Sequence, residues 1–233
     1  MEPGDIAIGL IWYVVLLFSL TLHEAGHAWA AARGGDLTAY RGGQVSLDPM
    51  PHVRREPFGM VIVPILFFFL TNASWMIGWA STPFDPRWAY AHPRRAAWMS
   101  LAGPAANLLL VVVSGIGIRV AMAAGAVEPG TTRFTELVVG TGSPVGEAVA
   151  IFLSLSFMLN LLLLVFNLIP VPPLDGSGAV GLVVSEDAAR RFQAFLAQPL
   201  FSFAGILVAW FAIPSIFGAV LPVALLLLFP EYL

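Results

Sequence analysis

Three ionisable side chains, His23, Glu24 and His27, lie within five residues of one another in a stretch that is otherwise almost wholly apolar. In an α-helix, residues four apart project from one face, so both imidazoles can reach the same metal ion. This spacing is typical of hydrolytic zinc sites, in which the carboxylate takes a proton from the attacking water. The alternative is a structural cluster that pairs with neighbouring helices. Because ionisable groups within a membrane span are usually functional, we predict a zinc site with Glu24 as general base.

A catalytic zinc ion usually has three protein ligands, so a third ligand is needed besides the two histidines. The chain has no cysteine, which leaves carboxylates. Asp175 is the strongest candidate, because it follows a proline-rich turn just beyond a long apolar stretch. Glu147 lies at the opposite end of that stretch and therefore at the wrong depth. The alternative role for Asp175 is to cap the N-terminus of the next helix.

Two asparagines, Asn107 and Asn167, lie beside breaks in apolar stretches. Their ordinary role would be hydrogen bonding between helices. Their side-chain amides could instead hold a substrate backbone or stabilise an oxyanion, and we expect both to contact substrate. His52 and His92 lie beside proline and arginine in loop-like sequence without a helical partner. We expect these two histidines to be solvated at the interface and to lie outside the metal site.

The composition indicates an integral membrane protein. Of 233 residues, 58% are hydrophobic and 11% are charged, which is too little polar surface for a soluble chain of this size. The first apolar run begins after Glu2 and Asp5 instead of a positive segment, and it contains the metal motif, so we interpret it as a retained span. No basic block suggests a nucleic-acid partner.

The expected fold is an all-α multi-pass membrane protein, with about five to six transmembrane helices and a small re-entrant β-hairpin element. We expect one domain over residues 1–233. Its predicted segments are a span at 6–32 with HExxH, a β-hairpin at 36–48, an apolar re-entrant segment at 58–83, a span at 96–124 with GPxxN, a span at 145–176 with NxxPxxxxDG, and a helical hairpin at 199–229.

The shared metal constrains the topology. His23 and Asp175 both lie toward the C-terminal ends of their spans, so a common depth requires the two spans to run parallel. The chain between them must then cross the membrane a net odd number of times, and one of the two intervening apolar segments cannot cross completely. Segment 58–83 is the weaker candidate, because Pro64 and Asn72 interrupt it. We expect it to enter and leave the bilayer on the same side.

Arginine placement tests this topology independently, since all 11 basic residues are arginines. With a re-entrant segment, nine arginines share one face and only Arg119 and Arg133 lie on the other. Full crossing would divide the arginines six against five. The first arrangement obeys the positive-inside tendency, so we expect the active site toward the cytoplasmic side of the cell membrane.

Three ordered motifs resemble those of the site-2 protease family of intramembrane zinc metalloproteases, the M50 family. Residues 23–27 resemble its HExxH, residues 103–107 its GPxxN, and residues 167–176 its NxxPxxxxDG. Residues 48–52 and 78–80 also resemble loop elements of the compact bacterial branch, which lacks PDZ and CBS domains. The resemblance covers most of the chain.

The resemblance implies a zinc-dependent endopeptidase that cuts a transmembrane protein within the lipid bilayer, in regulated intramembrane proteolysis. It implies that residues 44–48 and the strand near Trp79 help to present an unwound substrate. Two departures, at residues 53–59 and at Ser81 in place of a usual lysine, concern loop geometry or substrate choice. The resemblance assigns zinc to His23, His27 and Asp175, the general base to Glu24, and substrate contacts to Asn107 and Asn167.

Two functions of other classes predict different sequence features. A metal transporter would place polar groups at several depths along a path, whereas here they converge at one depth. A catalytically silent membrane chaperone would bind helices without needing a base, whereas Glu24 is intact.

Overall fold

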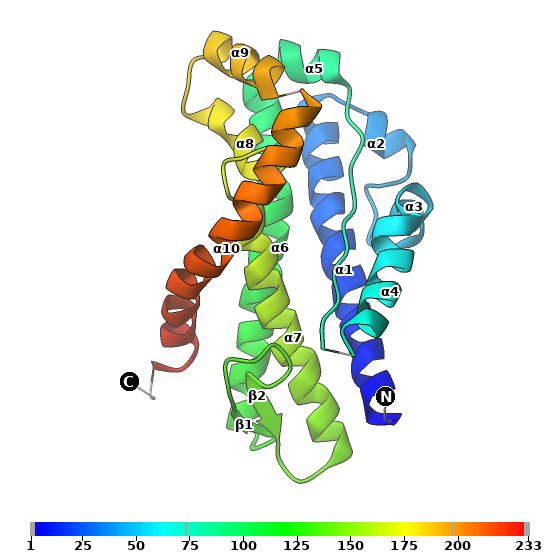
Figure 1. The fold of residues 1–233 in the computed structure, drawn as a ribbon, viewed down its shortest axis with the longest axis vertical. Helices are drawn as coiled ribbons and strands as arrows, with labels where there is room; N and C mark the ends of the chain where they lie inside the picture. Colours follow the sequence, from blue (N-terminus) through cyan, green and yellow to red (C-terminus); the bar gives the residue numbers. More distant parts are fainter. Residues whose placement is uncertain (1–2, 73, 197, 231–233) are drawn as a thin grey trace. The chain divides into compact units, whose positions relative to one another are not determined.

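The computed structural model describes residues 3–72, 74–196 and 198–230, which are largely helical (Figure 1). Four helices of this described part are long and apolar enough to cross a membrane, so the all-α multi-pass class is confirmed. Their number is smaller than the predicted five to six. The four are α1 (Pro3–Gly34), α6 (Pro93–Ala123), α7 (Pro144–Asn167) and α10 (Pro199–Leu228).

Contacts divide the chain into two compact units, and α1, α6 and α7 contribute to both. Unit 1 comprises Met1–Leu22, Leu47–Ser81 and Asn107–Leu161. Unit 2 comprises His23–Ser46, Thr82–Ala106 and Leu162–Leu233. All three predicted zinc ligands and Glu24 belong to unit 2.

The small sheet lies in unit 1, in the loop between α6 and α7. Its strands β1 (Val127–Pro129) and β2 (Val138–Gly140) pair antiparallel, with Val127 opposite Gly140. The main-chain N–H of Val138 also donates to the hydroxyl of Ser154 at 3.0 Å, which attaches the sheet to α7. A small hairpin is therefore present, but at a different place from the predicted one.

The hairpin predicted at residues 36–48 is wrong, because this segment contains the short helix α2 (Thr38–Arg41) and no strand. Asp36 explains the difference. Its Oδ1 accepts hydrogen bonds from the main-chain N–H and the hydroxyl of Thr38, at 2.9 and 2.5 Å, which favours a helical turn. Burial alone would raise the pKa of Asp36, but these hydrogen bonds and the charge of Arg41 hold that pKa below its ordinary value.

Of the segment predicted at 58–83, residues 58–81 belong to unit 1 and fold back on themselves. A π-helical turn, η1 (Phe58–Ile62), continues into α4 (Val63–Leu70), and from residue 75 the chain is extended. The N–H of Trp79 donates to the carbonyl of Gly59 at 3.1 Å, so the extended part returns to where the helix began. Such a fold-back is what a re-entrant segment requires, and its depth in the bilayer stays a prediction.

The two departures from the family pattern contact each other in this region. Glu56 lies between η1 and α3 (Met50–Arg55), and its Oε1 accepts a hydrogen bond from the hydroxyl of Ser81 at 2.5 Å. Ser81, which stands where the family pattern has lysine, thus has a carboxylate partner in the segment 53–59. This hydrogen bond attaches the extended part of the chain to the residues just before η1.

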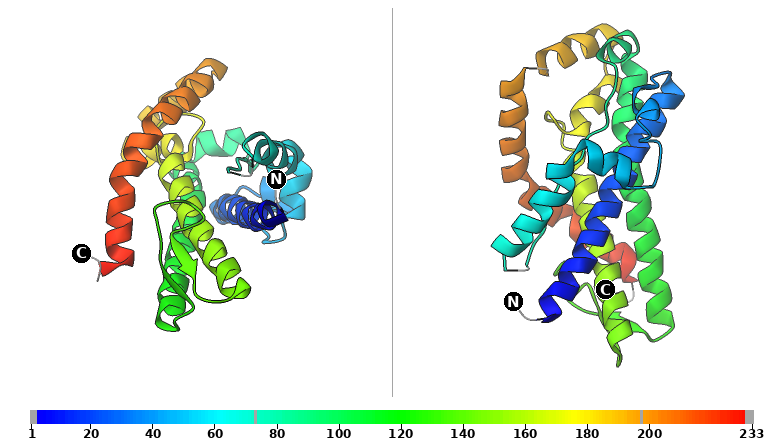
Figure 2. Two further views of the ribbon diagram at one scale, coloured as in Figure 1. Left: turned by 60° about the horizontal axis from the view of Figure 1, so that its bottom comes forward. Right: turned by 90° about the vertical axis from the view of Figure 1, so that its right-hand side faces the viewer.

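The C-terminal hairpin predicted at 199–229 is wrong, because α10 is one continuous helix (Figure 2). Pro214 and Pro222 lie inside it. Proline is tolerated in apolar helices when neighbouring groups and local adjustments satisfy the freed carbonyls, so two prolines did not require a turn. Most of the surface of α10 is exposed and apolar, as expected for a helix that faces lipid.

Unit 2 holds its short elements close to the ends of the long helices. Trp88 of α5 (Pro86–Ala91) packs with Ala31, Ala96 and Met99 and donates to the carbonyl of Gly34 at 3.0 Å. The remaining elements are α8 (Asp175–Ala179), η2 (Val180–Leu182) and α9 (Glu186–Leu196).

The turn between α7 and α8 is fixed by close contact with α10. Ile169 and Leu174 of this turn form a buried cluster with Ala209 of α10. A β-carbon at Gly205 of α10 would collide with the carbonyl oxygen of Pro172, so the helix approaches the turn as closely as a glycine permits. This packing determines where the first residue of α8, Asp175, is placed.

Candidate metal centre

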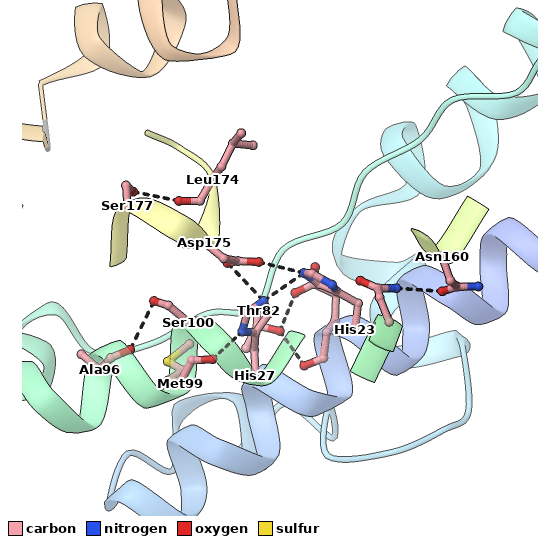
Figure 3. Close-up of polar contacts among 12 residues, drawn as sticks. His23, His27, Thr82, Ala96, Met99, Ser100, Asn160, Leu174, Asp175 and Ser177 are labelled. Atoms are coloured by element: carbon pink, nitrogen blue, oxygen red, sulfur yellow. Dashed lines mark hydrogen bonds and ion pairs between the residues drawn. The ribbon is translucent and has the colours of Figure 1, made fainter. Parts of the chain in front are cut away.

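Unit 2 brings His23, His27 and Asp175 to one point, where their ligand atoms all lie within 4.8 Å of one another (Figure 3). The two Nε2 atoms are 3.0 Å apart, Asp175 Oδ2 is 3.1 Å from His23 Nε2, and Oδ1 is 3.3 Å from His27 Nε2. Tetrahedral zinc with ligand bonds near 2.0–2.1 Å separates its ligand atoms by about 3.3 Å. The three side chains therefore fit a zinc ion as they stand.

The orientation of His27 is set by its other ring nitrogen. Nδ1 lies 2.7 Å from the carbonyl oxygen of Met99 on α6, a contact that requires the proton to be on Nδ1. Nε2 then presents a lone pair to the shared point. A backbone carbonyl that fixes the tautomer in this way is typical of metal-binding histidines.

Asp175 reaches the histidines because the chain turns tightly at Gly176. A β-carbon at Gly176 would lie 2.6 Å from the carbonyl oxygen of Ile169 and closer still to that of Leu168, so only glycine fits there. Asp175 Oδ2 is buried and accepts no hydrogen bond from any donor in the described chain. Oδ2 lies 3.1 Å from Nε2 of His23, and a cation held between these two atoms would satisfy the buried oxygen. Asp175 Oδ2 does not cap the N-terminus of α8, so the structure does not support capping as the alternative role of this oxygen.

Gly103 of α6 forms the wall behind the two histidines. A β-carbon at this position would lie 2.6 Å from His23 Nε2 and closer still to His27 Nε2. Gly26 of α1 permits the same close approach from the other side, since its β-carbon would lie 2.7 Å from the carbonyl of Ala102. The glycines of the two motifs thus let α1 and α6 approach closely, with no side chain at position 103 beside the two Nε2 atoms.

We predict that Gly103→Ala weakens zinc binding by about 10- to 100-fold, because overpacking of this kind costs about 1–3 kcal/mol. Alanine in a helix interior normally makes a protein more stable than glycine does, so a lower zinc affinity would not come from weakening of the helix. Zinc affinity measured by competition with a chromogenic chelator checks this. Gly218→Ala in α10, where a β-carbon meets nothing within 4 Å, is the control and should leave affinity unchanged. Equal affinities for the two variants would contradict the prediction.

Glu24 lies in the helical turn between the two ligands and is 5% exposed. Its Oε2 accepts a hydrogen bond from the hydroxyl of Thr82 at 2.7 Å, and the same hydroxyl is 2.9 Å from the main-chain oxygen of Glu24. The sequence did not single out Thr82. Its only signal was its place in the stretch 78–83, which the sequence predicts to be extended.

The two asparagines differ in their surroundings. Asn107, in unit 1, is fully buried, and its Nδ2 donates to Oδ1 of Asn160 on α7 at 2.8 Å. Asn160 in turn donates to the hydroxyl of Ser19 at 2.9 Å. Asn160 was not predicted from the sequence, although an asparagine inside an apolar span is a signal for such a hydrogen bond.

Asn167, in unit 2, is the half-buried last residue of α7. Substrate contact stays a prediction for both Asn107 and Asn167.

His52 and His92 do not belong to the metal centre formed by the residues that the structure describes. His92 is exposed, as expected. The solvation predicted for His52 is wrong, since this side chain is 1% exposed. His52 lies on α3, a short helix that the loop-like sequence did not predict, and the helix turns the ring inward.

Comparisons with known proteins give the following matches. The sequence model of peptidase family M50 matches residues 11–212. YwhC, a candidate zinc metalloprotease of Bacillus subtilis, is 33% identical over 164 residues, which cover 70% of this chain and 64% of YwhC. Rip2, a candidate zinc metalloprotease of Mycolicibacterium smegmatis, is 32% identical over 177 residues, which cover 75% of this chain and 57% of Rip2. The chain therefore spans less than two thirds of the length of these relatives. No solved structure matches it.

Proposed function

Because the chain belongs to peptidase family M50, we propose that it is a zinc-dependent endopeptidase that acts in regulated intramembrane proteolysis. It would hydrolyse a peptide bond within or near a transmembrane helix of another membrane protein. The observation that carries this proposal is the grouping of the buried His23 and His27 with the half-buried Asp175, with Glu24 between the histidines on α1. Helix α1 is itself long and apolar enough to cross a membrane.

The residues divide the chemistry between them. A zinc ion bound there would supply a Lewis acid for the scissile carbonyl and the attacking water. His23, His27 and Asp175 would hold the ion, and the hydrogen bond to Met99 keeps His27 in the tautomer that can bind it. Glu24 takes the proton from the attacking water and later delivers it to the leaving amine, as general base and then general acid.

The substrate must be unwound before it can be cut, because a helix hides its carbonyls in its own hydrogen bonds. Extended residues 75–81 lie beside η1, to which Trp79 is hydrogen-bonded. An unwound substrate segment can pair with such a strand through main-chain hydrogen bonds. Helices that contain glycine or proline unwind at lower cost, so the proposal favours substrates with these residues near the cut.

Asn167 and Asn107 complete the proposal as substrate contacts. The half-buried side chain of Asn167 at the end of α7 has no hydrogen-bond partner within the described chain, so its amide can bind a substrate backbone. Asn107 would have to exchange its bond to Asn160 for a bond to substrate.

The orientation of the site follows from charge. We propose that the metal centre lies toward the cytoplasm, because a segment at 58–79 that enters and leaves the bilayer on one side would leave the larger group of arginines on one face of the membrane. This group comprises Arg33, Arg41, Arg54, Arg55, Arg87, Arg94, Arg95, Arg190 and Arg191.

The test is cleavage of a single-span model substrate by the full chain in liposomes. We expect a cut near the cytoplasmic end of a substrate helix that contains a glycine–proline pair, and little cutting of a matched leucine–alanine helix. Removal of zinc by a chelator should stop cleavage, and added zinc should restore it. Mass spectrometry of the fragments gives the position of the cut.

Two outcomes would count against the proposal. Absence of products with both substrates, or cleavage that persists after zinc removal, would contradict the peptidase assignment. A cut near the outer end of the substrate helix would contradict the orientation alone.

A further inference from the structure

The hydroxyl of Thr82 has two acceptors, and both belong to Glu24. Thr82 is half-buried in the extended chain that precedes α5. Its Oγ1 lies 2.7 Å from Oε2 of Glu24 and 2.9 Å from the main-chain oxygen of the same residue (Figure 3). One side chain therefore contacts the general base at its carboxylate and at its backbone.

A hydroxyl has one proton to donate and lone pairs to accept with. It can therefore donate to only one of the two oxygens of Glu24 at a time. Donation to Oε2 holds the carboxylate in one position, and the nearby main-chain oxygen keeps the hydroxyl beside the helix that carries Glu24.

The chain just after Thr82 is attached to the end of α1 by two hydrogen bonds. The N–H of Asp85 donates to Oδ2 of Asp36 at 2.7 Å, and the indole N–H of Trp88 donates to the carbonyl of Gly34 at 3.0 Å. Asp36 and Gly34 follow Glu24 closely along the chain, at and just beyond the end of α1. The segment that carries Thr82 is thus fastened to the helix that carries Glu24.

We infer that Thr82 is a positioning residue for Glu24, which orients the carboxylate toward the attacking water. This inference rests on the proposed peptidase function. The competing explanation is structural, since the contact with the main-chain oxygen could simply attach the extended chain to α1. The two explanations differ in what loss of the hydroxyl does to catalysis when the fold is retained.

The experiment compares Thr82→Val, which keeps the shape and removes the hydroxyl, with Thr82→Ser, which keeps the hydroxyl. Loss of the hydroxyl should lower kcat by about 10- to 100-fold, the usual effect of removing a partner that orients a catalytic group. KM and zinc content should not change. Thr82→Ser should stay near the wild-type rate, and so should Ser100→Ala, whose hydroxyl donates to Ala96 instead.

Infrared spectroscopy supplies a readout that does not need activity. The difference spectrum between wild type and Glu24→Gln assigns the carboxylate stretch of Glu24, and we expect Thr82→Val, but not Thr82→Ser, to shift that band. A wild-type kcat in Thr82→Val, equal losses in the valine and serine variants, or an unshifted band would overturn the inference. If the wild type cuts no substrate, the proposed function fails, while the band still decides whether Thr82 holds Glu24.

Discussion

Glu24→Gln should lower kcat by about 10²- to 10⁴-fold, the range that a positioned general base contributes. Glutamine has nearly the same shape and keeps an oxygen that can accept the Thr82 hydrogen bond, but it cannot take a proton from water. Zinc content should stay at the wild-type level, because Glu24 is not one of the three grouped ligands. Initial rates at saturating substrate, together with metal analysis of the purified variant, check both statements.

The matched control is Glu147→Gln in the first turn of α7, which we expect to cut at the wild-type rate. If Glu24→Gln also cut at that rate, hydrolysis could not depend on this base and the peptidase assignment would be wrong. Loss of zinc from Glu24→Gln would point instead to Glu24 as a metal ligand.

The local part of the site could be predicted from sequence, because it depends on helical geometry alone. His23 and His27 are four residues apart on α1, and this spacing places their Nε2 atoms 3.0 Å apart. Asp175 could also be predicted, since a carboxylate beside a proline-rich turn has few other uses in an apolar chain. The bounds of α1 and α6 differ from the expected spans by a few residues, because long apolar runs leave little alternative to helix. Helix α7 begins one residue before the segment expected at 145–176 but ends at Asn167, where the proline-rich turn begins.

What the sequence did not predict depends on tertiary contacts or on competition between local signals. At residues 36–48, paired glycines favoured a hairpin, but the side chain of Asp36 starts a helical turn. In α10, Pro214 and Pro222 favoured a break, but the helix accommodates both. The partners Thr82 of Glu24 and Asn160 of Asn107 lie 58 and 53 residues away in the chain, and no periodicity connects such pairs.

Asp175→Asn is expected to have the largest effect on metal binding, a loss of zinc affinity of about 10²- to 10³-fold. Structural zinc sites bind with about 10–16 kcal/mol from four ligands, so one ligand contributes on the order of 3 kcal/mol. Asparagine keeps the size of the side chain but removes the negative charge. It also places an amide group where Oδ1 and Oδ2 now face Nε2 of His27 and His23. Competition with a fluorescent zinc chelator gives the affinity directly.

Asp187→Asn is the control for charge, because Asp187 is an exposed acid of α9 paired with Arg190 at 2.7 Å. Its affinity for zinc should equal that of the wild type. The decisive comparison is between the zinc affinities of the two variants, once circular dichroism has shown that both are folded to the same extent. If Asp175→Asn binds zinc as tightly as Asp187→Asn, zinc binding does not explain why Asp175 Oδ2 is buried without a hydrogen bond. The two histidines would then need a third ligand other than Asp175. If Asp175→Asn binds zinc more weakly than Asp187→Asn, as expected, Asp175 and the two histidines of α1 hold one ion between them. The close contacts at Gly103 and Gly176 are then explained, because they let the three ligands come together.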